Sequence, residues 1–168
     1  MKSWDYFFWV VWAFVLVIVL VFGLVVLIGA PYMPTLRQSC KKALKLLDLQ
    51  PGQTLIDLGC GDGIMLKMAA DSGLKAIGYE INPFLVVIAK LRTIRYGRKV
   101  KVKWGNFWRA DLSKADGIFV FLLDRYMSKL DNKISAEKGK GVKLVSHAFK
   151  IPGKAISKKS GALFLYEY

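Results

Sequence analysis

A glycine-rich stretch that also carries two carboxylates has the residue types and the spacing to hold a ligand. The apolar run 54–58 leads into it and a helical pattern follows from Ile64, so the sequence predicts a strand, a tight turn and a helix. The glycines of the turn occupy every second position: Gly59, Gly61 and Gly63. Such glycines let the backbone turn sharply and approach a bound molecule closely.

The charge of this turn limits which ligand it can hold. Asp57 and Asp62 place carboxylates beside it, and the turn contains no Lys. A phosphate-binding turn uses bare backbone amides or a Lys, so a cationic or hydroxyl-bearing ligand is the better expectation. A dinucleotide-binding turn, or a turn that holds no ligand, are the alternatives.

Two polar residues farther along the chain have positions that suit a nucleoside. Glu80 ends a predicted strand, 75–80, about 20 residues after the glycine turn, and a carboxylate there can accept hydrogen bonds from both ribose hydroxyls. Asn106 follows the predicted strand 100–104 and offers a donor and an acceptor to an adenine edge. An ordinary turn asparagine is the alternative at that position.

Asp124 is the candidate catalytic residue. It follows the apolar run 117–123, which is predicted to be a buried parallel strand ending at the edge where α/β sheets hold their ligands. Its carboxylate could orient an amine or accept a proton from it. The alternative is that Asp124 caps the helix predicted over 125–134.

The order of the strands and helices predicted around these residues indicates an α/β fold with a small, Rossmann-like and mostly parallel sheet. Strands are predicted at 54–58, 75–80, 100–104, 117–123, 142–146 and 162–168, and helices at 64–72, 82–95 and 125–134. The last strand is expected to be antiparallel, with 149–156 as its partner. The basic segments 138–141 and 154–160 are expected to be mobile loops. The inward face of the helix 82–95 is expected to consist of Leu85, Ile88, Ala89 and Leu91.

The chain before this domain is predicted to anchor it in a membrane. Residues 7–28 carry no charge and would form a helix of ~33 Å, enough to cross a bilayer core. The length of the run argues against a cleaved signal peptide. Lys2 is the one basic residue before the run, whereas four follow it closely, Arg37, Lys41, Lys42 and Lys45, so the positive-inside rule puts the C-terminal domain in the cytoplasm.

Three parts of the chain are therefore expected. Residues 1–30 form a transmembrane anchor. Residues 31–52 form a proline turn over 31–35 and a basic amphipathic helix, which packs on the sheet and could also lie on anionic headgroups. Residues 53–168 form the ligand-binding domain.

The overall charge and the scarcity of Cys and His narrow the choice of partners. A formal net charge of +14 favours anionic lipid headgroups, nucleic acid or an acidic protein. The only cysteines, Cys40 and Cys60, are expected to be free thiols. No Cys and His cluster has metal-ligand spacing and His147 is the only histidine, so neither a metal site nor a Ser–His mechanism is expected.

The motif Asp-x-Gly-x-Gly-x-Gly over 57–63 resembles motif I of the class I methyltransferases that use S-adenosylmethionine (AdoMet). In those enzymes the turn holds the methionine end and the ribose of the cofactor, and the positions of Glu80 and Asn106 extend the resemblance to the sheet. The resemblance implies a set of AdoMet contacts: Asp57, Gly59, Gly61, Asp62, Glu80 and Asn106. Asp62 would lie near the methionine amino group.

A narrower resemblance covers nearly the whole chain. A membrane span, the segment 31–35, the glycine turn, Gly-Tyr-Glu-Ile-Asn-Pro at 78–83 and Asn-Phe-Trp at 106–108 occur in an order similar to that of the small membrane-anchored lysine methyltransferases. Animal members of that family act on mitochondrial inner-membrane proteins, including the ATP synthase c subunit and the adenine nucleotide translocase. The resemblance implies AdoMet-dependent methylation of a lysine ε-amine in a membrane protein.

The chain also departs from that family. The position of Asp124 looks like a Pro in the animal proteins, so the family implies no catalytic role for it. A mitochondrial transit segment is not evident, which favours a prokaryotic plasma membrane. A phospholipid headgroup amine or RNA stays open as the methyl acceptor. An alternative from a different functional class is a membrane adaptor that binds AdoMet and catalyses no reaction.

Overall fold

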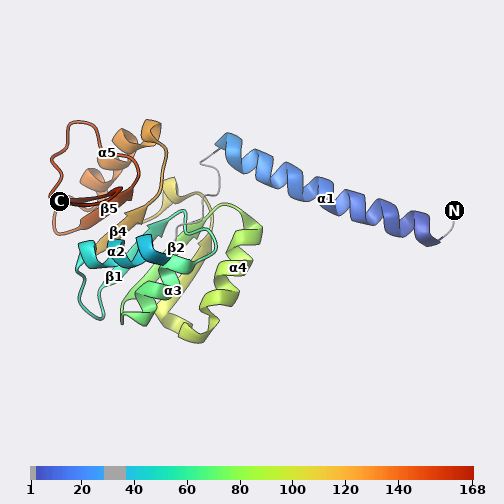
Figure 1. Cartoon of the computed structure of the whole chain (residues 1–168), viewed down its shortest axis with the longest axis horizontal. Coiled ribbons are helices and arrows are strands. Elements are labelled where there is room, and N and C mark those ends of the chain that lie inside the picture. The colour runs from blue at the N-terminus through green and yellow to red at the C-terminus, as the bar shows by residue number, and fades with distance from the viewer. Residues whose placement is uncertain (1–2, 29–36) are drawn as a thin grey trace. The chain divides into compact units, whose positions relative to one another are not determined.

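The computed structural model describes residues 3–28 and 37–168, which belong to two compact units that we treat separately (Figure 1). The first unit consists of helix α1 (Ser3–Ile28). Its described side chains from Trp4 to Leu20 are almost all exposed, and nearly all of them are apolar. The proline turn predicted over 31–35 lies outside the described residues.

The prediction that residues 7–28 cross a membrane is not confirmed. Within the described residues, no helix has both the length and the apolar character that a bilayer crossing requires. The predicted span includes 21, 22 and 24–28, whose side chains lie outside the described part of the chain.

The second unit is built on a seven-stranded sheet with the strand order β3-β2-β1-β4-β5-β7-β6. The strands are β1 (Thr54–Leu58), β2 (Lys75–Glu80), β3 (Val100–Trp104), β4 (Gly117–Val120), β5 (Lys143–His147), β6 (Lys158–Ser160) and β7 (Leu163–Glu167). The first five strands pair in parallel, and β7 pairs antiparallel with both β5 and β6. The Rossmann-like mixed sheet with an antiparallel C-terminal strand is therefore confirmed.

Helices cover both faces of this sheet. They are α2 (Arg37–Leu47), α3 (Ile64–Asp71), α4 (Pro83–Thr93) and α5 (Met127–Glu137), with 3₁₀ segments at Ile94–Lys99, Phe107–Arg109 and Asp124–Tyr126. Helices α2 and α3 share one buried cluster with Leu55 and Val145. Helix α5 contributes to a second buried cluster that contains Ile56 and Ile118. Because neighbouring residues of a strand point to opposite faces, the two clusters lie on the two faces of the sheet. The packing role predicted for the basic helix is borne out.

Three predictions about the second half of the chain are wrong. The antiparallel partner of the last strand is β6 and not 149–156, because Pro152 lacks an N–H and the N–H of Ile151 donates to the hydroxyl of Tyr166 at 2.9 Å. Part of the basic segment 154–160, expected to be a mobile loop, therefore forms the edge strand β6. The fourth strand also ends earlier than predicted, at Val120.

The face that α4 buries also differs from the prediction. Leu85, Val86 and Ala89 are buried, whereas Ile88 and Leu91 are exposed. The helix is apolar nearly all round, so its pattern does not single out one face. Close packing against the glycine turn selects the side that carries Ala89, because a Cβ built on Gly63 would lie only 2.9 Å from the Cβ of Ala89.

Candidate functional site

The glycine turn after β1 forms as predicted, at the carboxyl end of the parallel strands. Gly59, Gly61 and Gly63 have φ values of +98°, +52° and +79°, a region that side-chain-bearing residues rarely adopt. The N–H groups of Gly59 and Cys60 both donate to the carbonyl of Tyr79 in the neighbouring strand, each at 2.9 Å. A Cβ on Gly59 would meet no atom within 4 Å. The first glycine of the turn therefore leaves open space through which a ligand can approach the backbone.

Glu80 ties this turn to the start of α4. Its buried side chain accepts hydrogen bonds on both oxygens, from the N–H of Gly61 at 2.9 Å and from the N–H of Asn82 at 2.8 Å. Each carboxylate oxygen can accept a second bond. The predicted role of Glu80 toward ribose hydroxyls is compatible with this geometry and stays a prediction, but the side chain also holds the turn in shape.

Asp57 lies within β1 and is only 3% exposed. Burial, together with the negative charges of Glu80 and Asp62, raises its pKa to about 8. Near neutral pH the carboxyl group is therefore largely protonated in the free protein. A cation bound beside it would favour the ionised form, which suits a ligand that carries a sulfonium and an ammonium group.

Asp62 is already paired within the chain. One carboxylate oxygen accepts from the N–H of Ile64 at 3.3 Å, and the other forms an ion pair with Arg92 of α4. The predicted contact between Asp62 and a methionine amino group is untested, and it would have to share the carboxylate with Arg92. Sequence reasoning missed Arg92. Arg92 lies three residues after Ala89, which packs on the glycine turn, and this spacing could have indicated from the sequence that Arg92 lies near the turn.

Asn82 is a second residue whose importance the sequence did not reveal. Its Oδ1 caps α4 by accepting from the N–H groups of Phe84 at 2.9 Å and Leu85 at 3.5 Å. Its Nδ2 is buried and has no hydrogen-bond partner among the described residues. A buried donor without a partner is costly, so this amide beside Glu80 is suited to an acceptor on a ligand. The sequence pattern placed the start of this helix at Asn82 but predicted neither the cap nor the spare donor.

Asn106 and Asp124 lie in the segments that follow β3 and β4, two and four residues after these strands end, and both are exposed. The Oδ1 of Asn106 accepts from the N–H of Trp108 at 2.9 Å and caps the 3₁₀ segment after β3, so part of its acceptor capacity is used within the chain, while its amide NH₂ could serve an adenine edge. Asp124 begins the 3₁₀ segment that leads into α5, and no side chain caps either element. The alternative that Asp124 is a helix cap is therefore wrong.

Aromatic rings lie near Asp124 in the sequence and at the ends of β3, β4 and β5. Trp108 and Tyr126 are in contact with their ring centroids 6.0 Å apart, and Phe121 lies 4.4 Å from His147. Burial lowers the pKa of His147, and its Nδ1 has no partner among the described residues. The Nζ of Lys129 lies 4.5 Å from the centroid of the Trp108 ring, and the guanidinium of Arg125 lies 4.9 Å from that of the Tyr126 ring. Positive charges held here favour the neutral form of a nearby amine.

The donors and acceptors of the site fit AdoMet. The open approach at Gly59, the spare acceptor capacity of Glu80 and the unpaired amide of Asn82 suit a ribose and an amino acid moiety. Within residues 3–28 and 37–168, no group of three or more His, Cys, Asp or Glu side chains has the geometry of a metal site.

Comparison with known proteins agrees with this assignment. Residues 57–158 match the family described as the ANTKMT methyltransferase domain. The adenine nucleotide translocase lysine N-methyltransferase of Mus musculus is 34% identical over 125 residues, which cover 73% of this chain and 54% of that protein. A protein-lysine N-methyltransferase of Saccharolobus islandicus (strain REY15A) is 32% identical over 127 residues, covering 73% of this chain and 79% of that protein. The chain spans about half the length of the animal relatives it matches.

A solved structure shares the fold. The RNA methyltransferase from Salinibacter ruber, in complex with S-adenosyl-L-homocysteine, superposes with a TM-score of 0.74 at 28% identity, over 81% of this chain and 92% of that one. The match over 57–158 includes the glycine turn, Glu80, Asn106 and Asp124. The chain therefore belongs to the ANTKMT methyltransferase family, whose domain has the class I fold and uses AdoMet.

Proposed function

We propose that this protein transfers a methyl group from AdoMet to the ε-amine of a lysine in a protein substrate. The observation that carries the proposal is the family match over residues 57–158. The glycine turn supports it, because the hydrogen bond from the N–H of Gly61 to Glu80 holds the turn in shape before a ligand binds. Relatives that match the same part of the chain are named as lysine methyltransferases in animals and in Saccharolobus islandicus.

Asp124 is suited to prepare the acceptor amine. A lysine amine has a pKa of about 10.4 in water, so it must lose a proton before it can attack. The glycine turn and Glu80 would hold AdoMet, which would supply the methyl group on a positively charged sulfur; transfer to the amine would break the carbon–sulfur bond and leave a neutral thioether. The exposed carboxylate of Asp124 can accept the proton and pass it to water. The positive charges of Lys129 and Arg125, which lie over the rings of Trp108 and Tyr126, would favour the neutral form of the lysine amine.

The names of the animal relatives suggest membrane-embedded proteins as substrates. They are the adenine nucleotide translocase and subunit c of ATP synthase. The setting follows as part of the proposal: the protein works beside a membrane, with the catalytic domain on the cytoplasmic side of a prokaryotic plasma membrane. The exposed apolar side chains of α1 support membrane association.

RNA is the second candidate acceptor. The structural neighbour from Salinibacter ruber is named as an RNA methyltransferase, and the net charge of +14 would attract a polyanion. The relatives named as lysine methyltransferases favour a protein acceptor.

Transfer of a radioactive methyl group tests the proposal. The full chain is incubated with methyl-tritiated AdoMet and native membranes, and the protein, lipid and RNA fractions are separated. We expect label in protein, released as methyl-lysine after acid hydrolysis, and no transfer above background with the Glu80→Ala variant. Label confined to RNA or to lipid would refute a lysine acceptor. No transfer to any fraction, with AdoMet binding intact, would favour an adaptor without catalysis.

A further inference from the structure

Helix α4 carries an exposed apolar strip that methyl transfer does not use. Val87, Ile88, Leu91 and Ile94 are exposed by 56%, 43%, 64% and 74%. Ile94 directly follows α4 and begins the next 3₁₀ segment with helical backbone angles. Spacings of four and three therefore place Val87, Leu91 and Ile94 along one side, and Ile88 lies beside them. Four neighbouring aliphatic side chains so exposed form a patch, which on a protein surface generally indicates an interaction site.

Trp104 extends this strip near the start of α4. Its side chain is 70% exposed, and the indole Nε1 donates to the carbonyl of Ile81 at 3.0 Å, two residues before the helix. Val100 and Val102 of β3 pack in the cluster beneath α2 and α3, so Trp104, at the next alternate position, lies on the same face of the sheet. Helix α4 lies on that face too, beside α3 (Figure 1). We call the combined surface the α4 face: Val87, Ile88, Leu91, Ile94 and Trp104.

The surroundings of the α4 face are cationic. The segment 81–110 contains no Asp or Glu and eight basic residues: Lys90, Arg92, Arg95, Arg98, Lys99, Lys101, Lys103 and Arg109. Lys90, Arg98 and Lys99 are exposed, and among the described residues they form no ion pair. Each cation held near an anionic surface strengthens binding roughly fivefold.

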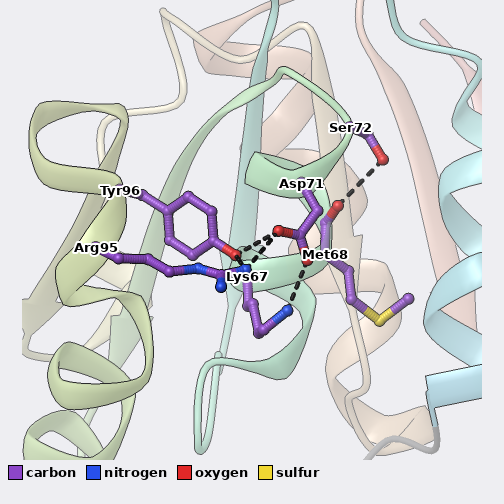
Figure 2. A network of polar contacts seen from close by, with 6 residues as sticks. All are labelled: Lys67, Met68, Asp71, Ser72, Arg95 and Tyr96. Carbon is purple, nitrogen blue, oxygen red and sulfur yellow. Dashed lines mark hydrogen bonds and ion pairs between the residues drawn. The ribbon is translucent and has the colours of Figure 1, made fainter.

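Two acidic side chains that face α4 and the segment after it, Asp71 and Asp62, already form ion pairs within the chain. Figure 2 shows Arg95 and Tyr96 reaching toward Asp71 of α3, where Lys67 also approaches. Arg95 and Lys67 lie 3.0 Å and 2.7 Å from the carboxylate of Asp71, and the bonds from Lys67 and Tyr96 lower its pKa to about 2. Asp62 is paired with Arg92 in the same way. The surface that remains around the apolar strip is therefore positive.

We propose that the α4 face docks on the surface of an anionic membrane. Its aliphatic side chains and Trp104 enter the headgroup region, while Lys90, Arg98 and Lys99 contact the lipid phosphates. Amphipathic helices that lie in a bilayer interface combine apolar and cationic residues in this way, and Trp is enriched there. Single-stranded RNA would use stacked aromatic rings rather than aliphatic side chains, and a second copy would bring two cationic surfaces together. The proposal does not depend on which group is methylated.

A fluorescent probe on α4 tests this contact in the full chain. Leu91→Cys is labelled with an environment-sensitive dye, which is directed to the new thiol because Cys40 and Cys60 are only 0% and 5% exposed. Ser135→Cys, at an exposed position of α5 on the other face of the sheet, is the matched control. Both proteins are mixed with vesicles of phosphatidylcholine and phosphatidylglycerol, and retained AdoMet binding shows that each is folded. Val87→Cys replaces the first variant if that variant does not fold.

We expect a blue-shifted emission and quenching by spin-labelled lipid at position 91, and neither at position 135. The shift should be weaker on vesicles of phosphatidylcholine alone and should decrease in high salt. Equal, water-like emission from both positions while the protein sediments with the vesicles would overturn the proposal. A shift that needs only RNA, or that grows with protein concentration in the absence of vesicles, would overturn it in favour of RNA or a second copy.

Discussion

The two ends of the candidate site differ in how far their polar side chains are bonded within the chain. At the cofactor end, Glu80 accepts from two backbone amides and Asp62 pairs with Arg92. At the acceptor end, Asp124 is exposed and caps neither of the elements that follow β4. The cofactor end is thus held in shape before a ligand arrives, whereas Asp124 would find its partner in a substrate. Changes at the first end should alter stability and binding together, and changes at the second should alter the rate alone.

Replacement of Glu80 by Ala is expected to have the largest effect. It leaves the buried N–H groups of Gly61 and Asn82 without acceptors, at a cost of about 1–3 kcal/mol each. We expect the unfolding free energy to fall by roughly 2–4 kcal/mol and AdoMet affinity to fall about a hundredfold or more. Denaturant unfolding and titration calorimetry measure the two quantities.

Glu80→Gln is the matched control for that variant. The Gln side chain keeps one acceptor oxygen, so this variant should be more stable than the Ala variant. Its AdoMet affinity should nevertheless be lower than that of the wild type. Unchanged AdoMet affinity in the Ala variant would refute the ribose assignment. Unchanged stability would show that the turn does not depend on the side chain of Glu80.

Substitutions at two glycines of the turn compare a position that packs against α4 with a position that faces the space open to a ligand. Gly63→Ala brings a Cβ to 2.9 Å from the Cβ of Ala89 in a left-handed backbone conformation, and it should lower the unfolding free energy by about 3 kcal/mol. Gly59→Ala faces open space, so it should cost only about 1 kcal/mol but should weaken AdoMet binding more than its stability loss predicts. Equal effects of the two substitutions on stability would contradict this division.

Asp124→Asn tests the acceptor end. We expect kcat to fall by about thirtyfold or more, because a neutral amide cannot accept a proton from the lysine amine. Stability and AdoMet affinity should stay within about 0.5 kcal/mol of wild type, since the side chain is exposed and caps no helix. Ser128→Ala, at an exposed position of α5, is the control for surface substitution. A normal rate with Asn would assign the proton to water or to another group.

Asp57→Asn is expected to have the smallest effect, and its sign depends on pH. The raised pKa of Asp57, about 8, means that the folded state keeps a proton that the unfolded state loses above about pH 4. The stability of the wild type should therefore fall as pH rises from about 4 to 8, and Asn should remove that loss, stabilising the free protein at pH 8 by about 1 kcal/mol or more.

Proton release on AdoMet binding gives an independent measure of Asp57. A bound cation favours the ionised carboxylate, so the wild type should release a proton near pH 7 and the Asn variant should not. Calorimetry in buffers of different ionisation enthalpy detects this difference. Identical proton release in the two proteins would exclude Asp57 as the titrating group.

Local pattern was a good guide where turn residues bound an element, and a poor guide where apolar residues surround a helix or a proline interrupts an apolar segment. Strands β1, β2 and β3 form over the predicted residues, since each is bounded by glycine or another turn residue. The pattern of α4 misled because apolar residues surround it, so only the contact between Ala89 and Gly63 decides which side is buried. The segment 149–156 has the hydrophobicity of a strand, but Pro152 interrupts it and the pairing moves to β6.

The sequence by itself determined the class of fold, the cofactor turn and the type of ligand. It could do so because glycine spacing, strand periodicity and the acid that ends β2 are local properties of the chain. Only the tertiary structure decided that Glu80 also holds the turn, that Arg92 pairs with Asp62, and that α4 leaves an apolar strip exposed. These features depend on groups that are distant in the chain and meet only when the sheet assembles, or on which side of a helix meets that sheet.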